Sequence, residues 1–376
     1  MTARGVTEVK LFPTQEIGSL AKPPWLVKAT RGQRPSAGDL AELDRWAERL
    51  VIEGTGELKA LLVSERPDKE RVRDWAALFA IRLQEVAGLD AVYDGEARRI
   101  EMYEYPVRRI AGFHFYGHVR SFDNKYYRKA AVVEKVRLTE PFHLDELTYV
   151  KSVARRAVKI PITGPYTLAD WSFNEHYLKT VDASVRDLRA RAYEAKRAFT
   201  LDLAREVLHP TLHALADAGA DWIQIDEPAA ATHPEEVPIL VEAFNAAVEG
   251  VKAKISIHIC YSNYRALYPE MLRMRVDHLA FEFKNTGDYN VVQIFKEHGD
   301  PRELGLGVLD VHSDVLETPE EIRDKLLGAA AVLGAEKIWG NPDCGLRTRT
   351  WDMAFAKLLN LVEGARLARE AITART

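Results

Sequence analysis

Cysteine is almost absent from this sequence, because its 376 residues include only Cys260 and Cys344. Two distant cysteines exclude the disulfide-rich framework of a small secreted domain, and in a reducing compartment they are better suited to metal binding or catalysis. No run approaches the roughly 20 apolar residues that span a bilayer, and residues 1–13 lack the apolar core of a secretory signal. We therefore expect a cytoplasmic protein with no membrane partner.

A surplus of positive charge is missing too. Lys and Arg total 52 against 56 Asp and Glu, the formal net charge is −4, and no basic stripe stands out. These values argue against nucleic acid as a partner. No low-complexity linker or internal repeat divides the chain, and its hydrophobic content of 47% is enough for one large core. We predict a single domain over residues 1–376.

Short apolar, strand-like runs alternate with longer segments of helical periodicity. The expected strands end near Ser19, Asp94, Val136, Thr163, Asp226, Cys260, Phe283, Asp310 and Asn341. The expected helices cover residues 36–51, 67–86, 182–218, 234–251, 263–275 and 318–333. This alternation predicts an α/β fold with a parallel sheet wrapped by helices. The number of repeats favours a closed (β/α)8 TIM barrel over an open doubly wound sheet.

The expected strands exceed the eight of such a barrel by one. The segment around residues 99–136 alternates aromatic and polar residues and contains the turn signal Asp123-Asn124. We therefore assign this segment to an accessory β-hairpin outside the barrel.

Both cysteines lie near expected strand ends. His258 and Cys260 are two residues apart on one strand, so their side chains share a face. Glu282 lies among apolar residues of another strand, where a carboxylate is costly unless it meets a cation or a metal. With Cys344, these residues offer one nitrogen, two sulfurs and one oxygen, which suits tetrahedral zinc. The alternatives are ordinary buried strand residues and a salt bridge of Glu282.

Other polar residues also fall at expected strand ends. Asp226 and Glu227 are adjacent, and one is suited to bind a substrate ammonium while the other caps the next helix. Glu104 is a second candidate for the ammonium, or else a surface carboxylate. His312 is a candidate acid or base near neutral pH, or else a loop histidine bonded to the backbone.

Separate motifs along nearly the whole chain together resemble one known family. They are Ile17-Gly18-Ser19, Gly164-Pro165-Tyr166-Thr167 with Trp171-Ser172-Phe173, Gln224-Ile225-Asp226-Glu227-Pro228-Ala229, His258-Ile259-Cys260-Tyr261-Ser262, Asp310-Val311-His312-Ser313 and Asn341-Pro342-Asp343-Cys344-Gly345-Leu346. In this order, they are similar to the catalytic barrel of cobalamin-independent methionine synthase.

This resemblance implies a zinc-dependent methyltransferase that makes methionine from homocysteine. The positions that correspond to zinc ligands are His258, Cys260, Glu282 and Cys344. The positions that match the site for the amino-acid part of homocysteine are Ile17, Ser19, Glu104 and Asp226. His312 matches the proposed proton donor, and Trp171 matches a residue of the methyl-donor site. Zinc would promote loss of the thiol proton, and the sulfur would then attack a methyl group.

The chain departs from the family's familiar form on the donor side. It resembles only the second of two barrels, so we expect the N-terminal barrel that helps to hold folate to be missing. Thr232 stands where that form has a folate-contacting glutamate, and Lys125-Tyr126 where it has Arg-Cys. We therefore expect a methylcorrinoid donor, either methylcobalamin or a corrinoid protein, because its cobalt leaving group needs no proton. Trp171 and His312 keep methyltetrahydrofolate as the alternative.

Two other interpretations differ in kind. The first is a thiol alkyltransferase with another acceptor, such as coenzyme M, but a sulfonate would need cations where Asp226 and Glu104 stand. The second is a protein without catalytic activity, in which zinc is structural or the chain completes a partner subunit.

Overall fold

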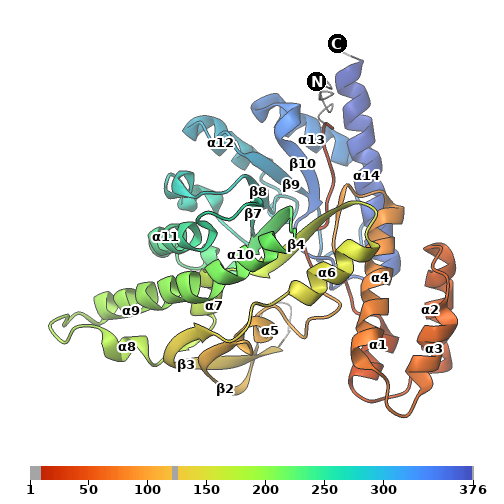
Figure 1. Cartoon of the computed structure of the whole chain (residues 1–376). Coiled ribbons are helices and arrows are strands. Elements are labelled where there is room, and N and C mark those ends of the chain that lie inside the picture. Colours follow the sequence, from red (N-terminus) through yellow and green to blue (C-terminus); the bar gives the residue numbers. More distant parts are fainter. Residues whose placement is uncertain (1–9, 121–125, 375–376) are drawn as a thin grey trace, which may run out of the picture.

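The computed structural model describes residues 10–120 and 126–374. Seven strands form one parallel sheet in the order β1-β4-β6-β7-β8-β9-β10. They are β1 (Ala91–Val92), β4 (Ala157–Thr163), β6 (Trp222–Asp226), β7 (Lys254–Ile259), β8 (His278–Phe281), β9 (Glu303–Leu309) and β10 (Ile338–Pro342). Figure 1 shows these strands in the middle of the molecule, with helices around them.

A short N-terminal segment closes the sheet. Thr14 forms a parallel bridge with Gly340 of β10, and Gln15 forms one with Ala91 of β1. The amide of Gln15 donates to the Gly340 carbonyl at 3.1 Å, and the amide of Ala91 donates to the Thr14 carbonyl at 3.2 Å. Both edges of the sheet therefore meet at this eighth position, and the predicted (β/α)8 barrel is confirmed.

The accessory hairpin lies outside the barrel, as predicted. Strands β2 (Ile110–Arg120) and β3 (Tyr126–Leu138) pair antiparallel, and β3 also pairs with the short strand β5 (Phe173–Asn174). The turn signal Asp123-Asn124 lies outside the described residues. In Figure 1 the hairpin curves below the barrel, beside α5 (Glu104–Val107).

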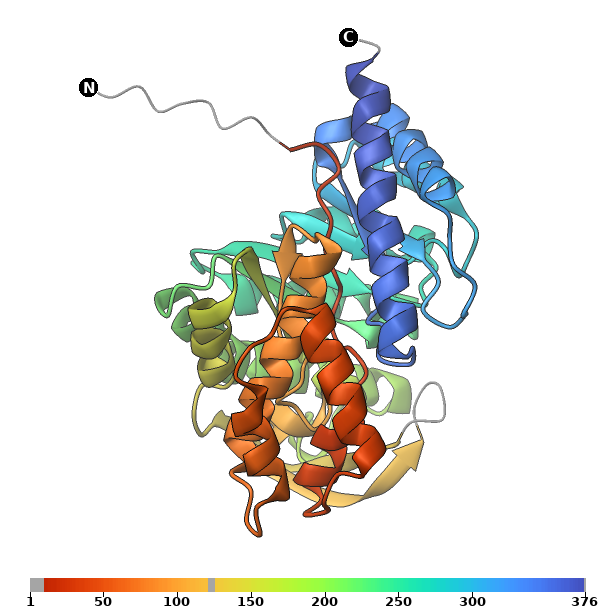
Figure 2. The same cartoon turned by 90° about the vertical axis from the view of Figure 1, so that its right-hand side faces the viewer.

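The described residues form α-helices, several of which have clear start signals. Apart from α5, they are α1 (Pro24–Thr30), α2 (Ala37–Arg49), α3 (Thr55–Val63), α4 (Lys69–Ala87), α6 (Leu144–Val153), α7 (Pro165–Asp170), α8 (Tyr177–Thr180), α9 (Leu188–Asp202), α10 (His209–Asp217), α11 (Val237–Val248), α12 (Gln293–His298), α13 (Pro319–Leu333) and α14 (Trp351–Thr373). Capping boxes begin α2 at Ser36 and α13 at Thr318. Figure 2 shows α14 along the side of the barrel, where it packs against α4 and α13.

Most predicted helices are confirmed. The segments 36–51, 67–86, 234–251 and 318–333 contain α2, α4, α11 and α13. The long helix predicted over residues 182–218 comprises α9, a π-helical turn over Leu203–Leu208, and α10. Because Pro210 has no amide hydrogen to donate to the Glu206 carbonyl, the regular α-helical pattern is interrupted there. Helix α14 is not among the predicted helices.

The helix predicted over residues 263–275 is wrong. This segment instead forms two short 3-10 turns, Tyr264–Leu267 and Glu270–Arg273. Pro269 lies between them, and a proline disfavours the helical conformation at the residue before it. Tyr268 is accordingly extended, with φ −95° and ψ 149°.

One continuous apolar core joins the strands of the barrel to the surrounding helices. Phe281 of β8 and Phe244 of α11, for example, are both fully buried in it. In the part of the chain that the structure describes, no helix is both long and apolar enough to cross a membrane.

Candidate metal and substrate site

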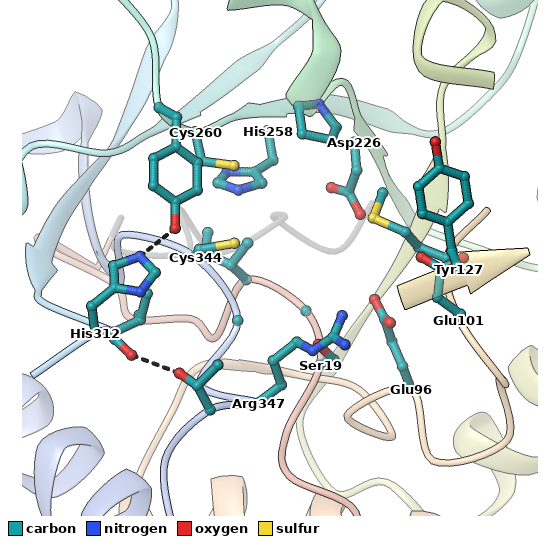
Figure 3. A pocket seen from close by; sticks show the side chains of 18 of the residues that line it. Ser19, Glu96, Glu101, Tyr127, Asp226, His258, Cys260, His312, Cys344 and Arg347 are labelled. Carbon is teal, nitrogen blue, oxygen red and sulfur yellow. Dashed lines mark hydrogen bonds between the residues drawn. The ribbon is translucent and has the colours of Figure 1, made fainter. Parts of the chain in front are cut away.

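Three of the predicted metal ligands converge at one end of the barrel. His258 lies on β7, Cys260 follows that strand directly, and Cys344 lies just beyond β10. Their ligand atoms all lie within 4.8 Å of one another. Parallel strands bring their carboxyl ends to the same rim, so residues far apart in sequence can meet there. Figure 3 shows both sulfur atoms close to the imidazole ring.

The His258 ring is oriented for metal binding. Its Nδ1 lies 3.0 Å from the carbonyl oxygen of Ala280, so Nδ1 carries the proton and Nε2 keeps a lone pair. Nε2 is buried and has no nitrogen or oxygen hydrogen-bond partner among the described residues. A buried acceptor without a partner needs an explanation, and a metal ion held together with the two sulfurs supplies one. One nitrogen and two sulfurs, with a fourth position left for substrate, suit catalytic zinc.

The two cysteines are free thiols that influence each other. The hydrogen bond from the Cys260 thiol holds the pKa of Cys344 well below its usual value. The same contact with Cys344 raises the pKa of Cys260. The pair therefore favours a thiolate at Cys344, and the thiolate is the form that binds metals.

Glu282, the fourth predicted ligand, is engaged elsewhere. It directly follows β8 and is buried. Its Oε2 accepts a hydrogen bond from the Tyr261 amide at 3.0 Å, and its Oε1 accepts one from the Asn285 side chain at 2.8 Å. Within the described residues, the converging group contains the other three ligands and omits this carboxylate. The structure thus gives Glu282 a role in holding the backbone after Cys260, and its binding to metal stays a prediction.

A second buried carboxylate fixes the loop after β8. Asp343 accepts hydrogen bonds from the three amides of residues 283–285, at 3.0, 3.0 and 2.6 Å. Gly307 on β9 makes room for it, because a Cβ there would lie 2.2 Å from Asp343 Oδ1. The loops that carry Glu282 and Cys344 are therefore joined directly, which fixes the metal side of the cavity.

Asp226, at the end of β6, lies beside His258 on the neighbouring strand. Gln224 donates a hydrogen bond from Nε2 to Asp226 Oδ1 at 2.7 Å. Burial raises the pKa of Asp226 to about 7, although His258 acts in the opposite direction. The side chain lines a cavity that the metal-ligand group also lines. A cation bound in this cavity would stabilise the ionised carboxylate.

The adjacent Glu227 does not line this cavity. It accepts hydrogen bonds from the amides of Tyr166 and Thr167, at 3.0 and 2.7 Å, in the first turn of α7. One carboxylate of the pair thus caps a helix, as expected, but the helix follows β4 and is not the next one in the chain. Burial raises the pKa of Glu227 to about 7.

Ile17 and Ser19, two of the predicted substrate-binding residues, also line the cavity. Their segment is tied to the barrel interior, because Gln224 Nε2 donates to the Ile17 carbonyl at 2.8 Å and the buried Lys159 donates to Gln224 Oε1 at 2.6 Å. On the other side, Gly345 permits a close approach, since a Cβ there would lie 2.7 Å from the Ser19 nitrogen. The segment after Cys344 therefore packs directly on the Ser19 segment.

Glu104 is not among the residues that line the cavity. It begins helix α5 instead of lying on a strand, and its carboxylate accepts a hydrogen bond from Arg108 Nε at 2.9 Å. Glu96 and Glu101 take its expected place in the cavity wall. A Cβ on Gly18 would lie 3.2 Å from Glu96 Oε1, so this carboxylate lies against the Ile17-Gly18-Ser19 segment. The strand expected to end near Asp94 could have pointed to Glu96.

His312 lies beyond β9 and lines the cavity. Its Nε2 shares a hydrogen bond with the hydroxyl of Tyr261, and its amide donates to Asp310 Oδ1 at 2.8 Å. Tyr261 has a left-handed backbone, with φ 53°. Figure 3 shows His312 on the opposite side of the sulfur atoms from Glu96. The candidate acid is thus separated from the carboxylates.

Trp171 belongs to an aromatic wall of the same cavity. Its ring centroid lies 5.4 Å from that of Tyr127, and the two planes are inclined by 30°. Tyr103 packs edge-on against Tyr127 at 5.1 Å, and its hydroxyl forms a 2.7 Å hydrogen bond with Ser172. Lys125 of the predicted donor-site pair lies outside the described residues. Tyr127 comes from β3, so the hairpin contributes to the site.

The sequence predictions gave no role to several of the lining residues. They are Glu96, Glu101, Met102, Tyr127, Tyr261, Arg347 and Thr348. Most lie on loops or on the hairpin, where no periodicity reveals the direction of a side chain. Arg347 could have been predicted, because it directly follows the motif that ends in Cys344-Gly345-Leu346.

A (β/α)8 barrel with a largely buried His-Cys-Cys group and acidic residues at its carboxyl rim is typical of metal-dependent enzymes. Residues 52–367 match the family described as cobalamin-independent synthase, catalytic domain. Methionine synthases from Pyrococcus furiosus and Sulfurisphaera tokodaii are 39% and 37% identical to this chain, each over 97% of it and 95% of the relative. The chain therefore belongs to the cobalamin-independent methionine synthase family, and it is a methyltransferase.

A solved structure supports the fold. The structure of a B12-independent methionine synthase from Shewanella sp. W3-18-1 in complex with selenomethionine has a TM-score of 0.75. The similarity covers 97% of this chain and 99% of that chain, at 21% identity.

The family assignment corrects one prediction. A methylcorrinoid donor, whether methylcobalamin or a corrinoid protein, is contrary to a family described as cobalamin-independent. Two features of the cavity agree with this correction. The aromatic wall around Trp171 and the acid candidate His312 both line the cavity, and a cobalt leaving group would have no use for a proton donor there.

Proposed function

We propose that this enzyme makes methionine by transferring a methyl group to the thiol of homocysteine, with zinc bound by His258, Cys260 and Cys344. One observation carries the proposal: the three metal-binding side chains and the acidic residues Asp226 and Glu96 line a single cavity. A metal site alone would fit many reactions, and acidic residues alone would fit any cation. Together they fit an acceptor that has a thiol at one end and an ammonium at the other.

Zinc would supply the Lewis acidity that lowers the pKa of the acceptor thiol toward neutrality. The thiol proton leaves to solvent, and the sulfur attacks the methyl carbon from the side opposite the leaving group. A sulfur–carbon bond forms while the bond between the methyl group and the donor nitrogen breaks, and the electron pair stays on nitrogen. Asp226 and Glu96 orient the acceptor for this attack.

The carboxylates Glu96, Glu101 and Asp226, which form an acidic wall of the cavity, also affect the choice of acceptor. An ionised carboxylate forms a strong, charge-assisted hydrogen bond with an ammonium group. Coenzyme M carries a sulfonate instead, and its negative charge would be repelled by Asp226 and Glu96. The carboxylates therefore favour homocysteine over coenzyme M.

We propose methyltetrahydrofolate as the methyl donor. Its flat ring system is suited to pack on the aromatic wall of Trp171 and Tyr127, and its departing nitrogen requires a proton. His312 is suited to supply that proton, because it lines the cavity on the side of the sulfur atoms opposite Glu96. We also propose that residues 1–376 act as one catalytic domain.

The zinc-loaded enzyme should be incubated with L-homocysteine and methyltetrahydrofolate that carries a deuterated methyl group. We expect methionine with the full mass shift, detected by mass spectrometry. Parallel reactions replace the donor with methylcobalamin or the acceptor with coenzyme M. Methionine from methylcobalamin alone would overturn the proposed donor, and methylation of coenzyme M but not of homocysteine would overturn the proposed acceptor.

A further inference from the structure

The cavity holds an uneven set of charges. Its wall carries the three carboxylates Glu96, Glu101 and Asp226, while Arg347 is the one residue with a permanent positive charge among the described residues that line it. An acceptor with only an ammonium would need no cation there. An α-amino acid also has a carboxylate, which would be repelled by the acidic wall unless a cation were present.

Arg347 is held in place by its neighbours. The amide of Leu346 donates to Glu16 Oε1 at 3.2 Å, and the hydroxyl of Thr348 donates to the Val311 carbonyl at 2.8 Å. The backbone on both sides of Arg347 is therefore anchored to the barrel. A side chain on an anchored backbone needs less ordering when a ligand binds.

The guanidinium of Arg347 faces the substrate side of the cavity. Figure 3 shows it extending beside Ser19 toward Glu96. Burial raises the pKa of Glu101, and the charge of Arg347 acts in the opposite direction, which places the guanidinium near this carboxylate. Within residues 10–120 and 126–374, the Arg347 side chain forms no hydrogen bond or ion pair.

Other arginines near the site are already paired. Arg99 is buried and donates to Glu146 at 2.9 Å. Arg349, two residues after Arg347, donates to Asp314 at 2.5 Å. Arg347 differs from both because its five N–H donors remain available beside a cavity.

We propose that Arg347 binds the α-carboxylate of the acceptor and thereby selects α-amino acids over simple aminothiols. This assignment rests on the proposed function and extends it. A guanidinium binds a carboxylate through two parallel hydrogen bonds, which fixes the orientation of the bound group. With the carboxylate at Arg347 and Ser19, the ammonium at Asp226 and Glu96, and the sulfur at the metal, the acceptor is held at three points.

The test compares two acceptors that differ only in the carboxylate. They are L-homocysteine and 3-aminopropane-1-thiol. The variants are Arg347→Met, which keeps length but removes the charge, and Arg347→Lys, which keeps the charge. Arg349→Gln is the matched control, because that arginine is paired with Asp314 outside the cavity lining. The readouts are kcat/KM for both acceptors and calorimetric binding of each acceptor to the zinc-loaded enzyme.

For Arg347→Met we expect kcat/KM and binding for homocysteine to fall about 10- to 100-fold, the range for a lost charge-assisted hydrogen bond. The values for 3-aminopropane-1-thiol should stay within about twofold, because no carboxylate is present to lose a partner. Arg347→Lys should recover part of the preference for homocysteine, and Arg349→Gln should keep the wild-type preference.

An equal loss for both acceptors in Arg347→Met would assign Arg347 a structural role and overturn the proposal. An unchanged preference for homocysteine would do the same. The proposed function is tested separately by the wild-type enzyme. If wild type methylates no homocysteine, the proposed function fails, whereas a failure confined to the variants removes only the role of Arg347.

Discussion

The metal side and the substrate side of the cavity are built from different kinds of structure. His258 and Cys260 belong to β7 and its end, and their directions follow from the strand itself. Glu96 and Arg347 lie on loops, and Glu96 has a left-handed backbone with φ 58°. Strand geometry converts a sequence spacing of two into a shared face, whereas a loop has no such rule. Sequence spacing can therefore predict the direction of a side chain on a strand, but not on a loop.

The two sides also differ in exposure. His258 and Cys260 are 3% and 4% exposed, while Arg347 is exposed. Buried ligands on strands keep a metal in one geometry, and a more open loop side lets substrate enter and leave. We therefore expect changes on the metal side to abolish activity, and changes on the substrate side to alter selectivity.

The largest effect should come from the metal side. Replacing either cysteine, as Cys260→Ala or Cys344→Ala, should remove bound zinc and lower kcat by at least about 1000-fold, because several kcal/mol of transition-state stabilisation depends on the metal. Zinc content by atomic emission and methionine formation measure the two losses. Full zinc content in both variants would show that the ion is bound elsewhere.

Glu282→Gln is the matched comparison at the same rim. The amide can still accept the hydrogen bond from the Tyr261 backbone, so we expect one zinc ion per chain to remain bound. Loss of zinc in this variant would instead show that Glu282 is a zinc ligand, as the sequence predicts.

The next effect concerns the stability of the strand ends. Burial raises the pKa of Glu227 from 4.5 to about 7 in the folded protein. The folded state then binds the proton more tightly than the unfolded state, so this stabilisation is present below about pH 4.5 and is lost as the pH rises through about 7. The shift corresponds to about 3 kcal/mol.

Glu227→Gln cannot ionise and should therefore show a shallower fall of unfolding free energy between about pH 5 and 7 than wild type. Urea denaturation at several pH values gives the slope. The comparison of slopes is independent of any constant loss of stability caused by the amide. Equal slopes in both proteins would mean that Glu227 does not titrate in this range.

The sequence patterns were sufficient for the barrel and for the convergence of three of the predicted metal ligands, for physical reasons. Alternation of strands and helices predicts a parallel barrel, and parallel strands place their carboxyl ends together. The convergence of His258, Cys260 and Cys344 therefore follows from their positions at strand ends. The closing segment was harder to place, because only Thr14 and Gln15 make bridges there, before the end expected near Ser19.

The substrate side could not be predicted in the same way. Glu104 was interpreted as a strand residue, but a short helix begins there and Arg108 pairs with its carboxylate. Glu96 sits in a turn after a strand of only two residues, too short to show any alternation. The predicted helix over 263–275 failed because Pro269 interrupts it. In each case, a short-range backbone feature outweighed the pattern of apolar residues.

Glu96 and Glu104 offer a direct test of this difference. Glu96→Gln should raise KM for homocysteine about 10- to 100-fold, because it removes a charged partner of the ammonium. Glu104→Gln is the matched control and should stay within about threefold, since Glu104 pairs with Arg108 away from the cavity lining. Steady-state kinetics with varied homocysteine gives both values. A larger increase of KM in Glu104→Gln than in Glu96→Gln would show that Glu104 binds the ammonium.

The smallest effect should come from the aromatic wall. Trp171→Phe keeps a ring but reduces the stacking area, so we expect KM for methyltetrahydrofolate to rise about 3- to 10-fold, a loss on the scale of one aromatic contact. KM for homocysteine should not change, because Asp226 and the metal ligands keep their positions. Tyr116→Phe, on the exposed part of the hairpin, is the control. A change in the homocysteine KM alone would place Trp171 on the acceptor side, and the separation between donor wall and acceptor wall would then be wrong.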